Sequence, residues 1–161
     1  QQSVVVLVPE IALTPQLASE FQQLHSNVLI MHSNLTESQR HQNWQLLLDS
    51  TEPWVIVGPR SALFVPLKNI GLIVVDEAHE PSYQQDSQPK YNALRVARKL
   101  ADFTNVPTKI LLGSATPLVT DYYFATETKS PIHTLSTPTN KRETSVEIVD
   151  IKDRSHFGTH S

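Results

Sequence analysis

Short apolar runs alternate with amphipathic stretches along most of the chain. Unbroken apolar runs rich in β-branched residues and leucine are typical of strands buried on both faces of a parallel sheet. Apolar residues three or four positions apart predict helices between those strands. The predicted strands are 4–8, 28–31, 54–57, 70–75 and 109–112, and the predicted helices are 13–24, 36–48, 93–103 and 118–126. This alternation predicts an α/β domain with a parallel sheet and helices on both faces.

Two of the predicted helices carry clear start signals. Thr14 followed by Pro15 fits an N-cap and a first helical position. The segment 36–39, Thr-Glu-Ser-Gln, has the capping-box pattern. Trp44 lies on the apolar side of that second helix, so we expect its ring in the core.

The sequence changes character in two places. Residues 80–90 are polar and bounded by prolines, which predicts a loop. Beyond Ser130, Thr, Ser and Pro become frequent, and only 132–135 and 146–149 have a strand pattern. We therefore predict a domain over 1–129 and a connecting segment over 130–161.

Composition narrows the class of protein. The chain has 161 residues, 39% of them hydrophobic, which suits one folded domain. Its formal net charge of −3 argues against binding nucleic acid through overall charge, so any such contact needs a local patch. No cysteine is present, which excludes a thiol nucleophile or cysteine zinc site in this chain. No apolar run is long enough to predict a membrane span. Because the chain starts with Gln1, we interpret it as a piece of a larger protein.

Four predicted strands end in unusual polar segments: 9–15, 58–62, 76–79 and 113–117. Parallel strands bring their carboxyl ends to one edge, where ligands bind in such sheets. Asp76 and Glu77 are the most informative pair. A carboxylate there can hold Mg²⁺ beside nucleotide phosphates, and its neighbour can activate water. The alternative is that Asp76 caps a turn and Glu77 is solvated.

The amino-acid sequences of these four segments resemble known motifs. Residues 76–79 read Asp-Glu-Ala-His, the DEAH box of superfamily 2 helicases, also called Walker B or motif II. Residues 113–117, Gly-Ser-Ala-Thr-Pro, resemble motif III of the same superfamily. The segments 9–14 and 58–62 resemble motifs Ia and Ib. Each match is short, but all four occur in order and each follows a predicted strand.

Longer segments of the sequence resemble one family more specifically. Residues 9–16 and 60–77, together with 113–117, are similar to the primosomal protein N′ family of bacterial replication-restart helicases. The resemblance covers about 4–150. It implies a RecA-like sheet of the P-loop NTPase type, cut before the Walker A strand and loop. It also implies an ATP-dependent 3′→5′ DNA helicase that acts at stalled forks and in primosome assembly.

The resemblance further implies partners and residue roles. ATP and Mg²⁺ would be the cofactors, with Asp76 holding Mg²⁺ and Glu77 activating water. His79, Ser114 and Thr116 would couple the nucleotide state to the DNA-binding face. The implied partners are forked or single-stranded DNA, primosome proteins and single-strand-binding proteins. The implied location is the bacterial cytoplasm, at the nucleoid.

DNA contacts are implied on two segments. Thr14, Arg60 and Ser61 would meet single-strand phosphates, for which an arginine supplies a charge-assisted hydrogen bond; an ordinary surface ion pair is the alternative for Arg60. The segment from Tyr83 to Tyr91 resembles the family's aromatic-rich loop. There Tyr83 and Tyr91 would stack on bases and Lys90 would add charge. Packing of both rings against the sheet edge is the alternative.

The chain also departs from the family pattern. Ala78 stands where the family commonly has Glu, and Pro59 stands where Thr is usual, which removes a backbone donor. No Gly-x-x-x-x-Gly-Lys-Ser/Thr occurs in the chain. Neither the second lobe nor the cysteine-rich zinc insertion is present. We expect this chain alone to bind ATP poorly, and its exposed sheet edge to favour self-association.

Two other functions remain open at this point. One is a different superfamily 2 translocase, RecG-like or of the restriction type, which Ala78 slightly favours and the strings at 9–16 and 60–64 disfavour. The other is a non-catalytic lobe that binds DNA or a partner protein. A Walker A motif just upstream would exclude the non-catalytic lobe. Cysteine pairs downstream would separate the two helicase classes.

Overall fold

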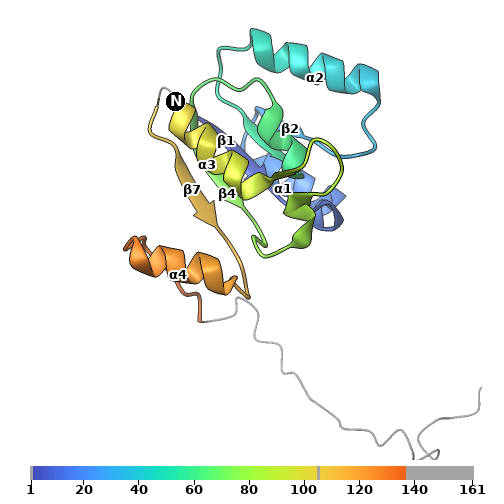
Figure 1. The fold of residues 1–161 in the computed structure, drawn as a ribbon. Helices are drawn as coiled ribbons and strands as arrows, with labels where there is room; N and C mark the ends of the chain where they lie inside the picture. Colours follow the sequence, from blue (N-terminus) through green and yellow to red (C-terminus); the bar gives the residue numbers. More distant parts are fainter. Residues whose placement is uncertain (1, 105, 137–161) are drawn as a thin grey trace, which may run out of the picture. The chain divides into compact units, whose positions relative to one another are not determined.

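A computed structural model describes residues 2–104 and 106–136, and the chain divides into two compact units, 1–124 and 125–161. The first unit is built on a parallel five-stranded sheet with the order β2-β3-β1-β4-β7 (Figure 1). The strands are β1 (Ser3–Leu7), β2 (Val28–Ile30), β3 (Val55–Gly58), β4 (Ile70–Val75) and β7 (Lys109–Leu112). The predicted parallel sheet is thus confirmed, with β1 at its centre.

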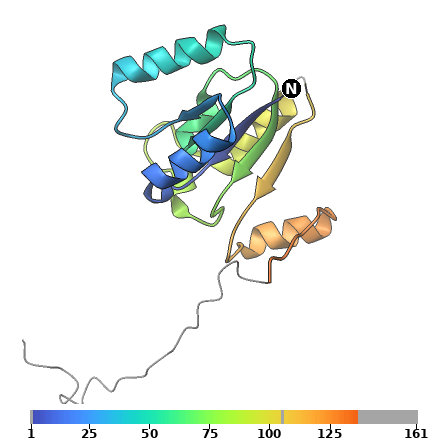
Figure 2. The same ribbon diagram turned by 180° about the vertical axis from the view of Figure 1, so that it is seen from behind.

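Side chains of β1, and of Val8 directly after it, alternate between two apolar clusters, one on each face of the sheet. Val5 and Leu7 face one cluster, to which α3 (Ala93–Phe103) contributes Ala93 and Ala97. Val6 and Val8 face the other cluster, where Leu17 and Phe21 of α1 (Pro15–Leu24) pack. Figures 1 and 2 show α3 and α1 over opposite faces. The prediction of helices on both faces is therefore confirmed.

Side-chain caps begin three of the helices. The Thr14 hydroxyl accepts the Leu17 amide at 3.2 Å, as predicted for α1. The predicted capping box starts α2 (Glu37–Asp49), where Thr36 and Gln39 bond each other's backbone amides. Asn92 caps α3, and this cap was not predicted. A fourth helix, α4, spans Val119–Glu127.

Short elements connect the strands to the helices. Three 3₁₀ turns lie at Glu10–Ala12 (η1), Arg60–Phe64 (η2) and Pro81–Tyr83 (η3). The predicted loop at 80–90 is more ordered than expected, because η3 leads into an antiparallel pair, β5 (Gln84–Gln85) and β6 (Tyr91–Asn92). This two-strand hairpin leads directly into α3.

Two further predictions about the fold are wrong. Residues 132–135 form no strand; they pair with no described strand, and Leu135 is 95% exposed. Trp44 is 46% exposed, because α2 turns Leu47 rather than Trp44 into the core. The predicted strand at 146–149 lies outside the described residues, and the boundary between 129 and 130 stays a prediction. In the part of the chain that the structure describes, no helix has the length and apolar character to cross a membrane.

Candidate functional site

The acidic turn after β4 is hydrogen-bonded to the ends of both neighbouring strands. The Asp76 amide donates to the Leu7 carbonyl at 2.9 Å, and the Ala78 amide donates to the Gly113 carbonyl at 2.8 Å. The turn is thus tied to β1 on one side and to the end of β7 on the other. Segments 76–79 and 113–117 therefore meet at the carboxyl edge of the sheet, as predicted.

Glu77 has an uncommon backbone conformation. Its φ is 45°, in the left-handed region, where a residue with a Cβ is strained. Hydrogen bonds hold it there: its amide bonds Asp76 Oδ1 at 3.0 Å, and its carbonyl accepts the Glu80 amide at 2.8 Å. Backbone strain of this kind concentrates at functional sites. The turn therefore holds Glu77 in a strained backbone conformation. The hydrogen bonds around it must offset the free-energy cost of that conformation.

The predicted coupling residues contact one another. His79 Nδ1 lies 2.8 Å from Ser114 Oγ and 3.4 Å from Glu77 Oε2. Ser114 Oγ also accepts the Thr116 amide at 3.1 Å. The shorter distance identifies Ser114 as the hydrogen-bond partner of His79 Nδ1, and the longer contact to Glu77 is an ion pair only when the imidazole is protonated. A continuous chain of contacts thus joins Glu77 to the segment after β7.

The two carboxylates fit a hard divalent cation. Asp76 is exposed, and Glu77 Oε2 is buried with no hydrogen-bond donor among the described residues. Carboxylate oxygens are preferred Mg²⁺ ligands, and Mg²⁺ keeps several water or phosphate ligands of its own. Within the described ranges, no group of three or more His, Asp or Glu side chains could hold a metal alone. A Mg²⁺ held here would therefore need oxygen ligands from water or phosphate.

A groove of about 350 Å³ runs along the same edge of the sheet, past the ends of β1, β2 and β3. The groove is lined by four of the predicted DNA contacts, which therefore come together: Arg60, Ser61, Tyr83 and Tyr91. Lys90 is exposed but does not line the groove. Thr14 does not line it either, and its hydroxyl is used as the cap of α1.

Tyr83 corrects one expectation. Its side chain is buried, with 2% of its surface exposed, so it has no free ring face for a base to stack on. Its hydroxyl donates to the Asp76 carbonyl at 2.6 Å. Burial raises the pKa of the phenol well above its usual value, and the nearby charges of Asp76, Glu77 and Glu80 raise it further. For Tyr83, the structure shows the packing alternative.

Arg60 is bound to the segment that carries Tyr83. Its Nη1 donates to the Ser82 carbonyl, one residue before Tyr83. The surface ion pair considered for Arg60 is not found among the described residues. The guanidinium therefore links the β3 end of the groove to η3.

Sequence reasoning missed two cationic or titratable residues of the groove. His32 and Arg40 line it, from the loop after β2 and from α2. Arg40 donates to the carbonyls of Leu35 and Ser33, which fixes its side chain at the end of β2. Neither residue belongs to a motif, so only the strand order could have brought them to this edge.

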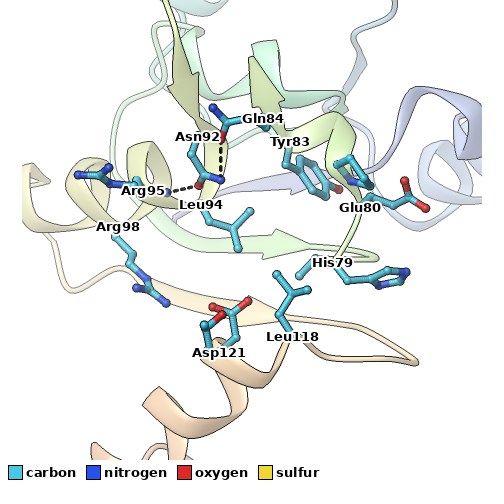
Figure 3. A pocket seen from close by; sticks show the side chains of 13 residues that line it. His79, Glu80, Tyr83, Gln84, Asn92, Leu94, Arg95, Arg98, Leu118 and Asp121 are labelled. Atoms are coloured by element: carbon cyan, nitrogen blue, oxygen red, sulfur yellow. Dashed lines mark hydrogen bonds between the residues drawn. The ribbon is translucent and has the colours of Figure 1, made fainter. Parts of the chain in front are cut away.

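A second cavity, of about 310 Å³, flanks the acidic turn in the first unit (Figure 3). His79, Glu80 and Tyr83 line one part of it, and the hairpin contributes Gln84 and Asn92. Arg95 and Arg98 of α3 complete another part, and Arg98 lies 4.9 Å from the centre of the Phe124 ring. This cavity thus borders the DEAH turn at Ala78 and His79, and it shares Tyr83 with the groove.

The chain belongs to the DEAD/DEAH box helicase family, whose model matches residues 1–122. That match, on a parallel sheet with the DEAH turn at its carboxyl edge, also confirms the RecA-like fold class.

More particularly, the chain is similar to part of proteins named replication restart protein PriA. It is 38% identical to the one from Bacillus subtilis over 159 residues, 98% of this chain and 19% of that protein. Identity is 42% to those of Synechocystis and Chlamydia muridarum, over 76% and 90% of this chain and 15% and 19% of those proteins. The chain thus spans about a fifth of the length of these relatives. The resemblance to replication-restart helicases is confirmed.

Proposed function

We propose that this chain is part of the first motor lobe of an ATP-driven 3′→5′ DNA helicase that acts in replication restart. The observation that carries the proposal is the Asp76–Glu77 turn, held between β1 and the end of β7 and connected through His79 to Ser114. DEAD/DEAH box helicases in general use a nucleotide and Mg²⁺. The similarity to replication restart proteins supports a role at stalled forks.

The surroundings of the two carboxylates support the roles that the family resemblance implies. Asp76 is exposed and would bind Mg²⁺, which when present neutralises phosphate charge. Glu77 Oε2 has no hydrogen-bond donor among the described residues and would accept the proton of the attacking water. His79, Ser114 and Thr116 would report the state of this turn to the segment after β7. The phosphate cradle and the second lobe lie outside this chain in the proposal, so the chain alone hydrolyses no ATP at a useful rate.

The DNA strand would lie along the groove. Arg60 and Ser61 would contact its phosphates, and Tyr91, half-buried with its ring perpendicular to that of Phe64, would offer a face to a base. Thr14 and Lys90 are exposed and would extend the contact beyond the groove. The proposal includes primosome and single-strand-binding proteins as partners. It also includes a cytoplasmic location at the nucleoid.

The direct test is strand displacement by a full-length protein that carries this chain. We expect ATP-dependent unwinding of a fork loaded on a 3′ single strand, and none from a 5′ single strand. Unwinding only from the 5′ strand would contradict the direction. Duplex translocation without unwinding would favour the other superfamily 2 translocases. DNA binding with no ATP dependence would favour a non-catalytic lobe.

A further inference from the structure

The loop that follows β2, residues 32–35, is hydrogen-bonded from two sides. The Ser33 amide donates to Glu10 Oε1 of η1 at 3.1 Å. Arg40 of α2 donates from Nη2 to the Ser33 carbonyl at 2.9 Å and from Nε to the Leu35 carbonyl at 3.1 Å. The loop and the Arg40 guanidinium therefore hold each other in one arrangement at the carboxyl end of β2.

The Arg40 guanidinium is not neutralised by these contacts. Both of its bonds go to carbonyl oxygens, which accept hydrogen bonds but carry no net charge. The bonds use two of the five N–H groups that an arginine offers. The ion pairs found in the described part of the chain do not include Arg40. Arg40 also lines the groove, so a fixed cation with free donors faces that space.

Arg60 has a similar arrangement at the neighbouring strand. It follows β3, which pairs with β2, and it donates to the Ser82 carbonyl. Among the described residues that line the groove, the only carboxylate is Glu10, and its Oε1 already accepts the Ser33 amide. Two arginines thus face one carboxylate in a chain whose formal net charge is −3. This is the local basic patch that a nucleic-acid contact requires.

The rest of the groove lining favours a nucleic-acid strand over an acidic peptide. Tyr91 and His32 line it together with the two arginines. Aromatic rings beside cations suit a single strand, because its bases stack while its phosphates accept charge-assisted hydrogen bonds. An acidic peptide would use the charges and leave the tyrosine ring without a base to contact.

We infer that Arg40 is a further phosphate-contacting residue: its guanidinium, held by the carbonyls of Ser33 and Leu35, binds a phosphate of the same strand that Arg60 contacts. This inference rests on the proposed function. It extends the DNA contact to α2 and to the loop after β2, which belong to none of the four helicase motifs of this chain.

The test is Arg40→Ala in the full-length protein, with a short single-stranded oligonucleotide as the probe. We expect the oligonucleotide concentration that half-saturates ATP hydrolysis to rise about five- to fifty-fold, the equivalent of one charge-assisted hydrogen bond. On a logarithmic plot against salt concentration, the slope should become shallower by about 0.7, the value of one phosphate contact to a single strand. The rate at saturating DNA should stay within about two-fold of the wild type.

The matched control is Arg95→Ala. Arg95 is exposed on α3 and does not line the groove, so this change removes the same charge from another surface. It should leave both the half-saturating concentration and the salt slope unchanged. Equal effects of Arg95→Ala and Arg40→Ala would mean that only overall charge matters, which would overturn the inference.

Arg40→Lys separates phosphate contact from a purely structural role in the loop. Lysine keeps the charge but lacks the planar fork that bonds two carbonyls and a phosphate together. We expect a wild-type salt slope with a half-saturating concentration between those of the wild type and Arg40→Ala. An unchanged slope in Arg40→Ala, or an equal loss of slope in Arg40→Lys, would overturn the inference.

Direct binding of the same oligonucleotide, followed by fluorescence anisotropy, separates this inference from the proposed function. A wild-type protein that hydrolyses no ATP would refute the proposed function, and the salt slopes of direct binding would still decide the role of Arg40. Weaker binding in Arg60→Ala but not in Arg40→Ala would overturn the inference alone. Arg40→Ala that loses affinity for poly-glutamate but not for DNA would assign the groove to an acidic peptide and would also overturn it.

Discussion

Gly58 is expected to be indispensable to the packing of the sheet edge. It is the last residue of β3, is buried, and its carbonyl accepts the Val8 amide at 2.9 Å. A Cβ added there would lie 2.7 Å from Met31 Cβ and 2.9 Å from the Met31 carbonyl oxygen. Both distances are shorter than the van der Waals contact of the atoms involved. The Met31 backbone cannot retreat freely, since its amide bonds the Val57 carbonyl at 2.8 Å.

The size of the effect follows from two opposing contributions. Forcing an extra methyl into a packed site costs about 1–3 kcal/mol, whereas replacing Gly by Ala reduces the entropy of the unfolded chain and regains about 0.4–1 kcal/mol. We expect Gly58→Ala to destabilise the chain by about 1–2 kcal/mol net. For a chain of this length that corresponds to a Tm lower by about 2–8 °C.

Gly113→Ala is the matched control. A Cβ at Gly113 would lie 3.6 Å from Asp76 Oδ1 and 3.7 Å from the Val75 carbonyl oxygen, which are ordinary contacts. No described glycine has a positive φ, so backbone strain does not distinguish the two sites. Thermal unfolding of the purified chain, followed by circular dichroism, should show a lower Tm for Gly58→Ala only. Equal Tm values for Gly58→Ala and wild type, or an equal loss in Gly113→Ala, would refute the reasoning.

Three further predictions concern packing, association and pH. Leu47→Ala should lower the free energy of unfolding by about 2–5 kcal/mol in chemical denaturation, because Leu47 is the buried residue of α2. Trp44→Ala should lower it clearly less, because Trp44 is 46% exposed, and equal losses would contradict the packing of α2. The outer side of β7 pairs with no described strand, and Leu111 is 53% exposed, so the isolated chain should self-associate in analytical sedimentation. Leu111→Lys should reduce this self-association, and a wild-type chain that sediments as a monomer would contradict the prediction. The pKa of Tyr83 is raised in the folded state, so the folded protein keeps a proton that the unfolded chain loses above pH 10; stability should therefore fall as pH rises beyond that value, and Tyr83→Phe should show a shallower fall in denaturation at pH 9 to 11.

Most of the sheet could be predicted because its strands are apolar runs, and the three central strands β1, β3 and β4 are largely buried. The bounds predicted for β4, α3 and β7 agree with the structure, since apolar runs and helical spacing mark each of them clearly. The hairpin β5–β6 could not be found in this way, because strands of two residues carry no measurable alternation. Trp44 was misplaced because helical spacing identifies an apolar side but not how deeply it is buried.

The sequence could predict that the candidate site lies at the carboxyl edge of the parallel sheet. Asp76, Glu77 and Ser114 follow strands, so parallel topology alone brings them close together. The residue roles came from resemblance to a family and stay proposals. The hydroxyl contact of Tyr83 and the groove positions of His32 and Arg40 depend on how separate loops pack, which no local pattern encodes.

In the proposed function, Glu77 is the water-activating carboxylate of an ATP-driven motor. The most direct test of this role is DNA-stimulated ATP hydrolysis by the full-length protein and its Glu77→Gln variant, beside Glu80→Gln as a matched carboxylate change three residues away. We predict a loss of about 10²–10⁴-fold in rate for Glu77→Gln, with DNA binding kept and Glu80→Gln close to wild type. Hydrolysis that is absent in the wild type, or that continues at the wild-type rate in Glu77→Gln, would rule out this role for Glu77.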